Sequence, residues 1–238
     1  MLTKKKPKFG LTNNQLKIIA MVCMLFDHLG EGLFPYCLPL RIVGRLALPI
    51  FAYMIAEGCL YTKNRVKHLG LIAALGIGCQ VVYWFAMESL YQSILITFTL
   101  SIVLIYSIDG LLRHKSVWKV LASVLGLIFV YVVAIVLPRR YEKQGFYIDY
   151  DIYGILMPVA VYYAKGKIGK LLALGLMIGS TIFALGPLQA YAFLALPILY
   201  LYDGTRGRAK LKYLFYVFYP THLVVIYFLQ LLQAAGKI

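Results

Sequence analysis

Long apolar runs separated by short polar connections dominate the sequence. A helix that spans a bilayer needs about 20 mostly apolar residues. The pattern predicts nine such helices, at residues 12–34, 41–62, 69–87, 91–112, 117–137, 150–164, 170–186, 188–202 and 211–233. Prolines inside several runs predict kinked or partly re-entrant helices. The predicted fold is an all-α, polytopic integral membrane protein in which residues 1–238 form a single transmembrane domain.

The distribution of basic residues predicts how these helices are oriented. Connections on the side of the N-terminus carry 18 Lys and Arg residues, whereas those on the opposite side carry 6. Cytoplasmic loops of membrane proteins are enriched in Lys and Arg. We therefore expect a cytoplasmic N-terminus and a multi-pass protein of the cytoplasmic (cell inner) membrane.

Composition supports a membrane location and narrows the possible partners. Hydrophobic residues make up 62% of the chain and charged residues 14%, against roughly 45–50% and about 25% in soluble domains. The net charge of +15 would suggest nucleic acid in a soluble protein, but the orientation signal accounts for most of it. We expect the lipid bilayer, and no nucleic acid, as a partner. The four cysteines form no C-x-x-C pair, and we expect no metal site.

Ionisable residues inside the predicted helices are the best candidates for function, because each one is costly in a bilayer unless it has a partner or lines a cavity. Their depths predict one polar cluster in the outer half of the membrane, made by Asp27, His28, Arg45 and His222. Asp27 points about 100° away from His28 around the helix. We therefore expect Asp27 to orient a group on a neighbouring helix, such as Arg45.

Lys17 lies on the same helix face as His28, eleven residues earlier, which corresponds to about 16 Å along the helix. This spacing suits a long ligand with an anionic head, whose phosphates lie near Lys17 and whose reactive end lies near His28. Glu57 lies at a depth similar to that of Lys17, so the two side chains are candidates for a pair. Asp109 is interpreted as a structural pair or a helix-end group.

Four segments resemble the TraX family, which is named for an inner-membrane protein that N-acetylates conjugative pilin. They are LKIIAMVCMLFDHLG (16–30), RIVGRLALPIFAYMIAEGCLYT (41–62), SILITFTLS (93–101) and FYVFYPTHL (215–223). TraX is similar in turn to larger transmembrane acyltransferases, which carry a basic residue, ten residues and then a His in the first helix. Lys17 and His28 fit that spacing. The resemblance implies acetyl-CoA as the donor and His28 at the reaction centre.

The sequence therefore predicts a membrane acetyltransferase that uses acetyl-CoA as donor substrate and a peptide amine or a glycan as acceptor. His28 is either a general base or a transient acyl carrier. The candidate catalytic residues are His28, Asp27, Arg45 and His222. The candidate residues for binding the donor are Lys17, Glu57, Lys63, Arg65, Gln80, Thr97 and Thr99. Two alternatives stay open: a proton- or ion-coupled transporter, and an assembly protein whose polar side chains hold helices together.

Overall fold

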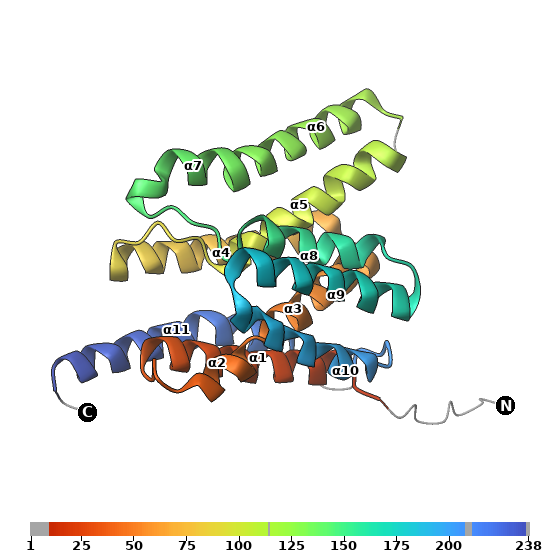
Figure 1. Ribbon diagram of the computed structural model, residues 1–238. Coiled ribbons are helices and arrows are strands. Elements are labelled where there is room, and N and C mark those ends of the chain that lie inside the picture. The colour runs from red at the N-terminus through yellow and green to blue at the C-terminus, as the bar shows by residue number, and fades with distance from the viewer. Residues whose placement is uncertain (1–9, 114, 208–210, 237–238) are drawn as a thin grey trace. The chain divides into compact units, whose positions relative to one another are not determined.

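The computed structural model describes residues 10–113, 115–207 and 211–236 (Figure 1). Within these ranges the chain is helical and contains no β-strand beyond two isolated bridges, so the all-α prediction is confirmed. Some bases in the orientation count lie outside the described residues: Lys4, Lys5, Lys6, Lys8, Arg208, Lys210 and Lys237. The orientation of the N-terminus stays a prediction.

All nine predicted segments are helical, but they differ in their ability to span a bilayer. Six stretches of the described residues are long and apolar enough: Leu38–Tyr61, Arg65–Phe85, Ile94–Arg113, Val117–Gln144, Gly166–Leu185 and Val217–Ala234. Helix α1 (Asn13–Gly32) is 20 residues long but carries several charged and amide side chains. Helix α8 (Asp151–Tyr163) has 13 residues, which is too short for a straight span. The apolar helical stretch Pro187–Tyr200 is also shorter than the six candidate spans. The chain is a multi-pass membrane protein by these helices, and the count of nine spans stays a prediction.

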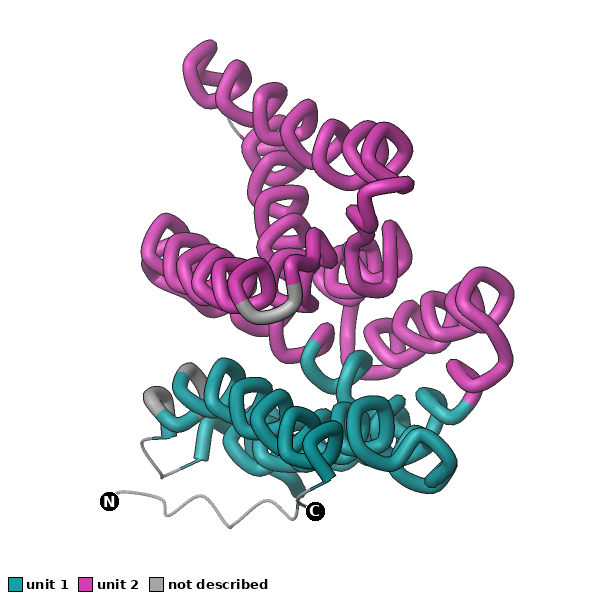
Figure 2. Tube along the Cα trace, turned by 90° about the vertical axis from the view of Figure 1, so that its left-hand side faces the viewer, with its two compact units in different colours: residues 1–51, 191–238 teal, residues 52–190 magenta. Residues whose placement is uncertain are grey.

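The chain divides into two compact units, which Figure 2 shows in different colours. Unit 1 contains residues 1–51 and 191–238, and unit 2 contains residues 52–190. The first boundary falls inside α3 (Ala47–Tyr61), and the second falls inside the 3-10 helix η3 (Pro187–Leu194). The single-domain organisation expected from the sequence stays a prediction.

Unit 1 brings the beginning of the described chain together with its end. Helix α1 packs against both α2 (Leu38–Gly44) and α11 (Lys212–Ala234). Thr12 caps α1 through a reciprocal arrangement with Gln15, which satisfies backbone donors of the first turn. Leu11 forms backbone hydrogen bonds to Leu201 and Asp203, just after α10 (Ala195–Tyr200). These contacts join the segment before α1 to the segment after α10, although the two are distant in the sequence.

Unit 2 is built around helix α5. This helix (Ile94–Arg113) contacts α4 (Arg65–Met87), α6 (Val117–Tyr131) and α8, and α8 in turn packs against α9 (Gly166–Leu185). After α6 the chain continues through a π-helical turn, η1 (Val132–Val136), then α7 (Leu137–Tyr141) and a 3-10 turn, η2 (Glu142–Gln144). An apolar core cluster of unit 2 contains Leu100, Val130, Ala134, Ile148 and Ile155.

Small residues allow α5 and α6 to approach closely. Ser107 of α5 faces Gly126 of α6, and Gly110 of α5 faces Ser123 of α6, so each glycine accommodates the hydroxyl of the opposing serine. Small residues spaced three or four apart are a common way to pack helices in a bilayer, where apolar side chains gain little from contacting one another rather than lipid. The tight packing of α6 against α5 follows from these four positions.

Candidate functional site

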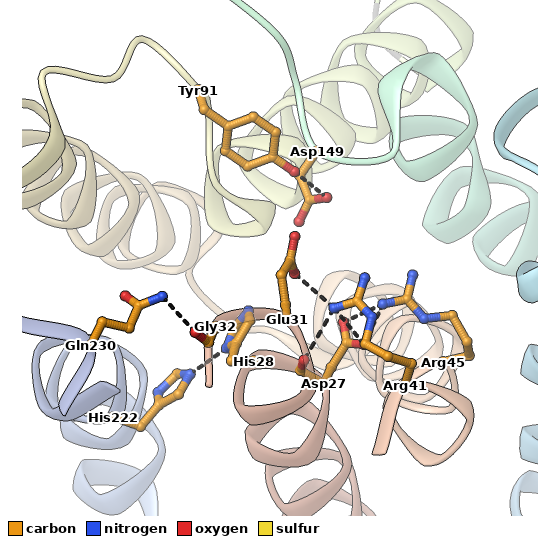
Figure 3. Close-up of polar contacts among 10 residues, drawn as sticks. All are labelled: Asp27, His28, Glu31, Gly32, Arg41, Arg45, Tyr91, Asp149, His222 and Gln230. Carbon is orange, nitrogen blue, oxygen red and sulfur yellow. Dashed lines mark hydrogen bonds and ion pairs between the residues drawn. The ribbon is translucent and has the colours of Figure 1, made fainter. Parts of the chain in front are cut away.

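An ion pair between α1 and α2 forms one half of the candidate site. Arg45, directly after α2, donates to both carboxylate oxygens of Asp27 on α1, and both side chains are buried (Figure 3). Both contacts come from one guanidinium nitrogen, Nη2, so the pair is held by charge-assisted hydrogen bonds from a single corner of the guanidinium. The structure therefore brings Asp27 and Arg45 together, as expected from the position of Asp27 about 100° around the helix from His28.

Arg41 extends the ion pair along one face of α1. Its Nη1 donates to the backbone carbonyl of Asp27 at 3.1 Å and to Glu31 Oε2 at 2.8 Å, and it lies 3.2 Å from Asp27 Oδ1. Asp27 precedes His28 directly and Glu31 follows it by nearly one helical turn. Arg41 thus holds the turn of α1 that carries His28. In the sequence, Arg41 is one of the six bases of the connections opposite the N-terminus and carries no other prediction. Its spacing of four residues from Arg45, which places both on one helix face, was the available signal.

Gly44 permits this ion pair to form. A Cβ atom at Gly44 would collide with the Cβ and carboxylate of Asp27. The glycine therefore acts through lack of a side chain, which lets α2 lie directly against the Asp27 turn of α1.

Replacing Gly44 with alanine is expected to lower the free energy of unfolding by about 1–3 kcal/mol, because the added methyl group overpacks the contact. Gly70 of α4 is the matched control, since a Cβ there meets no atom within 4 Å. The control change Gly70→Ala should raise stability by about 0.5–1 kcal/mol, the usual gain of alanine over glycine in a helix. Thermal unfolding of both variants in the same detergent measures the difference. Equal stabilities would contradict the close contact at Gly44.

Two histidines form the other half of the candidate site. His28 Nδ1 lies 2.8 Å from His222 Nε2, and the two rings are nearly parallel, with an interplanar angle of 16° (Figure 3). His222 is buried and His28 is half-buried. The ring of Phe218 stacks on His222 with a centroid distance of 4.7 Å, and Tyr219 meets it edge-on. This histidine dyad, His28 and His222, therefore joins α1 to α11, and aromatic side chains pack around His222.

The hydrogen bonds of the dyad determine which nitrogen atoms carry protons. His222 Nδ1 lies 2.8 Å from the backbone carbonyl of Phe218, which can only accept, so His222 Nδ1 must donate. In a neutral His222 the Nε2 atom then accepts, and His28 Nδ1 donates to it. The remaining nitrogen of His28, Nε2, is left with a lone pair, and it has no hydrogen-bond partner among the residues that the structure describes. This chain of bonds makes His28 Nε2 the proton acceptor of the dyad.

A third contact between α1 and α11 lies beyond the dyad. The Gln230 amide donates to the Gly32 carbonyl at the end of α1, at 3.1 Å (Figure 3). Together with the histidine bond, it fixes the two helices at two heights. The sequence reasoning did not single out Gln230. The available signal was an amide side chain in an apolar helix, since such a group needs a partner in a bilayer.

Lys17 lies on α1 in unit 1, as expected, and is half-buried. The helix is continuous between Lys17 and His28, so their predicted alignment along one face of α1 is retained. The backbone carbonyls of Thr205 and Arg206 accept from Asn13 and Asn14 at the start of the same helix. Thr205 and Arg206 therefore lie at the end of α1 that carries Lys17.

The other predicted donor-binding residues lie in unit 2, and most of them have protein partners. Glu57 accepts from Lys170 at 2.5 Å, and Lys170 also lies 5.7 Å from the ring centroid of Tyr53. The sequence suggested Lys17 as a partner of Glu57, whereas the partner that the structure provides in unit 2 is Lys170. Lys63 is exposed, and Arg65 donates to Asp109 at 2.6 Å.

The hydroxyl groups of Thr97 and Thr99 donate their protons to backbone carbonyl oxygens. Thr97 donates to the Asp149 carbonyl at 2.9 Å, and Thr99 donates to the Leu95 carbonyl of its own helix at 2.7 Å. In this arrangement neither hydroxyl offers a proton to a ligand. The Asp149 carboxylate accepts from Tyr91 (Figure 3), and the Gln80 amide donates to the Ser89 carbonyl. These bonds hold the loops around α5 in place.

Among the described residues, no three His, Cys, Asp or Glu side chains gather as a metal site requires.

Comparison with known proteins identifies the family. The family model described as "TraX protein" matches residues 12–230, which covers nearly the whole chain. The chain belongs to the TraX family. It is also 31% identical over 243 residues to the probable fimbrial assembly protein FimC, serogroup H1, of Dichelobacter nodosus, covering 89% of this chain and 93% of that protein. A shorter similarity, 36% over 58 residues, links it to the uncharacterized protein RP591 of Rickettsia prowazekii (strain Madrid E), covering 24% and 23% of the two chains.

No solved structure matches the chain. The TraX match includes α1, α2 and most of α11, which contribute both the ion pair and the histidine dyad. The candidate site therefore lies within the part of the chain that defines the family.

Proposed function

We propose that the chain is a membrane acetyltransferase that moves the acetyl group of cytoplasmic acetyl-CoA to an amine, such as the N-terminus of a pilin-like peptide. We place its N-terminus in the cytoplasm and the protein in the cytoplasmic membrane. Membership of the TraX family and similarity to a protein named for fimbrial assembly support a pilin-associated role. The observation that carries the proposal is the hydrogen-bond chain from Phe218 through His222 to His28, which leaves one imidazole nitrogen ready to accept a proton.

A general base is what this transfer requires. The nitrogen lone pair of the neutral amine attacks the carbonyl carbon of the thioester and forms the new C–N bond. The bond between carbon and sulfur breaks, and its electron pair leaves with the sulfur of coenzyme A. His28 Nε2 takes the proton that the amine nitrogen must lose, and the imidazolium then gives this proton to the departing thiolate. The products are the acetylated amine and free coenzyme A, and His28 returns to its starting state.

His222 and the arginines act on this step through His28. His222 accepts from His28 Nδ1, which fixes the tautomer of His28 and stabilises its imidazolium form when the proton arrives. Arg45 and Arg41 hold the turn of α1 on either side of His28 through Asp27 and Glu31. We assign these three as positioning residues. The cation of Lys17, about 16 Å along the same helix face, is placed to attract the phosphates of the donor.

Acetyl transfer by the purified protein tests this proposal. The protein in detergent is mixed with acetyl-CoA labelled in the acetyl group and with one of two peptides of identical sequence. One peptide has a free N-terminal amine, and the other has a blocked N-terminus but keeps its hydroxyl groups. We expect label in the free peptide only. Label in the blocked peptide would contradict an amine acceptor. Absence of label in both peptides, together with proton or ion flux in liposomes, would contradict the acetyltransferase proposal and favour a transporter.

A further inference from the structure

A second cluster of charges lies in unit 2, around a carboxylate that is fully enclosed. The side chain of Asp109, near the end of α5, has 0% exposure. Its Oδ2 atom accepts from Arg65 and from the Tyr162 hydroxyl, each at 2.6 Å. Its Oδ1 atom accepts from the Tyr163 hydroxyl at 3.3 Å and lies 3.3 Å from Arg113 Nη2. Side chains from α4, α5 and α8 thus converge on a single negative charge.

The cluster carries more positive than negative charge. Two guanidinium groups share one carboxylate, which leaves a net charge of +1 if only these three groups are counted. Both guanidiniums touch the same carboxylate, so they are held close together and repel each other. An additional anion between or beside them would relieve this repulsion. The tyrosines are neutral donors and do not change the balance.

Both arginines have hydrogen-bond donors to spare. Arg65 and Arg113 each reach Asp109 through Nη2 alone, whereas a guanidinium has five N–H donors. Neither makes another hydrogen bond within the described part of the chain. Their side chains are 40% and 61% exposed, so a ligand can reach the free N–H groups. The guanidinium of Arg65 also lies 4.8 Å from the ring centroid of Tyr106, which restricts its plane.

The chemistry of the cluster fits a phosphate group. A phosphate offers several acceptor oxygens, and arginine binds such oxygens in a two-point geometry. Arg65 is also the first residue of α4, where backbone N–H groups and the helix dipole favour an anion. Asp109, with its two tyrosine donors, fixes the arginines before the ligand arrives, so less side-chain entropy is lost on binding. The exposed cations of Lys63, just before α4, and of Lys67, in its first turn, add to the attraction.

We propose that Arg65 and Arg113, held by Asp109, form a binding site for a phosphate group at this end of unit 2. Two ligands offer that chemistry: the nucleotide phosphates of a coenzyme A derivative, and the headgroup of an anionic phospholipid. The coenzyme A alternative rests on the proposed function, in which acetyl-CoA is the donor. Binding is measured with no acceptor present, so failure of this site and failure of acetyl transfer are distinguishable.

Binding of two probes to the purified full-length protein in non-ionic detergent tests the site. Coenzyme A is titrated by calorimetry, with pantetheine, which lacks the nucleotide phosphates, as the control compound. Phosphatidylglycerol retention is measured by native mass spectrometry. We expect Arg113→Gln and Arg65→Gln each to weaken binding of one probe by about tenfold, since each removes a charge-assisted contact. Arg113→Lys should recover part of the loss.

Arg140→Gln is the matched control, because Arg140 is an exposed arginine on α7 in the same unit. It should bind both probes as the native protein does. Weakened coenzyme A binding with unchanged pantetheine binding identifies a nucleotide phosphate as the ligand, and weakened lipid retention identifies a headgroup. Thermal melting confirms that Arg113→Gln is folded, as expected for a side chain at the exposed end of α5. If the native protein binds neither probe, or if both arginine variants bind as Arg140→Gln does, the proposal is wrong.

Discussion

Replacing His28 with glutamine is expected to lower acetyl transfer by about 10²–10⁴-fold, the usual contribution of a general base. Glutamine keeps an amide N–H that can donate to His222 but offers no basic nitrogen in place of Nε2. The loss should therefore appear in kcat while the variant stays folded. Initial rates with labelled acetyl-CoA, combined with a melting curve for each protein, measure the two effects separately.

The matched control is His68→Gln, because His68 lies in unit 2 and bonds to the Tyr106 hydroxyl at 2.9 Å. This variant should transfer acetyl groups at close to the native rate. His222 adds a second comparison: His222→Gln keeps an acceptor for His28 Nδ1, whereas His222→Leu removes it. We expect the glutamine variant to retain more activity than the leucine variant. Native turnover in His28→Gln would exclude the imidazole as the base and with it the proposed mechanism.

Replacing Arg45 with methionine is expected to lower the free energy of unfolding by about 3–5 kcal/mol, because removal of one partner leaves a buried charge poorly compensated. Among the described residues of unit 1, Asp27 would keep Arg41 as its cationic partner. The double change Asp27→Leu with Arg45→Met should be less damaging than Arg45→Met alone, because an apolar pair has no uncompensated charge. Unfolding in mixed detergent micelles measures the three proteins on one scale.

Glu31→Gln serves as the control for the Arg45 experiment. Glu31 also pairs with an arginine of α2, but its side chain is 65% exposed. Exposed ion pairs contribute about 0–1 kcal/mol, so this variant should remain close to the native stability. A loss in Arg45→Met no larger than that in Glu31→Gln would show that the Asp27 pair behaves as a surface pair.

The sequence predicted those contacts that depend on residues being expensive in a bilayer. Asp27 and Arg45 occur inside apolar runs, and the cost of leaving either without a partner made their pairing the simplest solution. His28 and His222 are 194 positions apart, and similar depth in the membrane was enough to group them. The helical segments were predicted from a different property, the length of the apolar runs.

Contacts of cations near helix ends were not predictable in this way. Lys170 and Arg41 are among the connection bases that predict the orientation, but the structure places them on Glu57 and on the Asp27 turn. A long basic side chain at a helix end can extend outward to water or fold back onto a carboxylate, and the sequence is the same in both cases. The Asp109 cluster shows the same limitation, because Tyr162 and Tyr163 look like ordinary interfacial tyrosines until α8 is packed against α5.

The pairing of α1 with α11 has a consequence for biosynthesis. The two halves of the histidine dyad are made at different times in translation, because His28 and His222 lie 194 positions apart. A ribosome-bound chain lacking α11 has His28 without the acceptor that sets its tautomer. The proposed base is therefore completed only when α11 has been inserted, and a chain that has not yet reached α11 lacks the partner of His28.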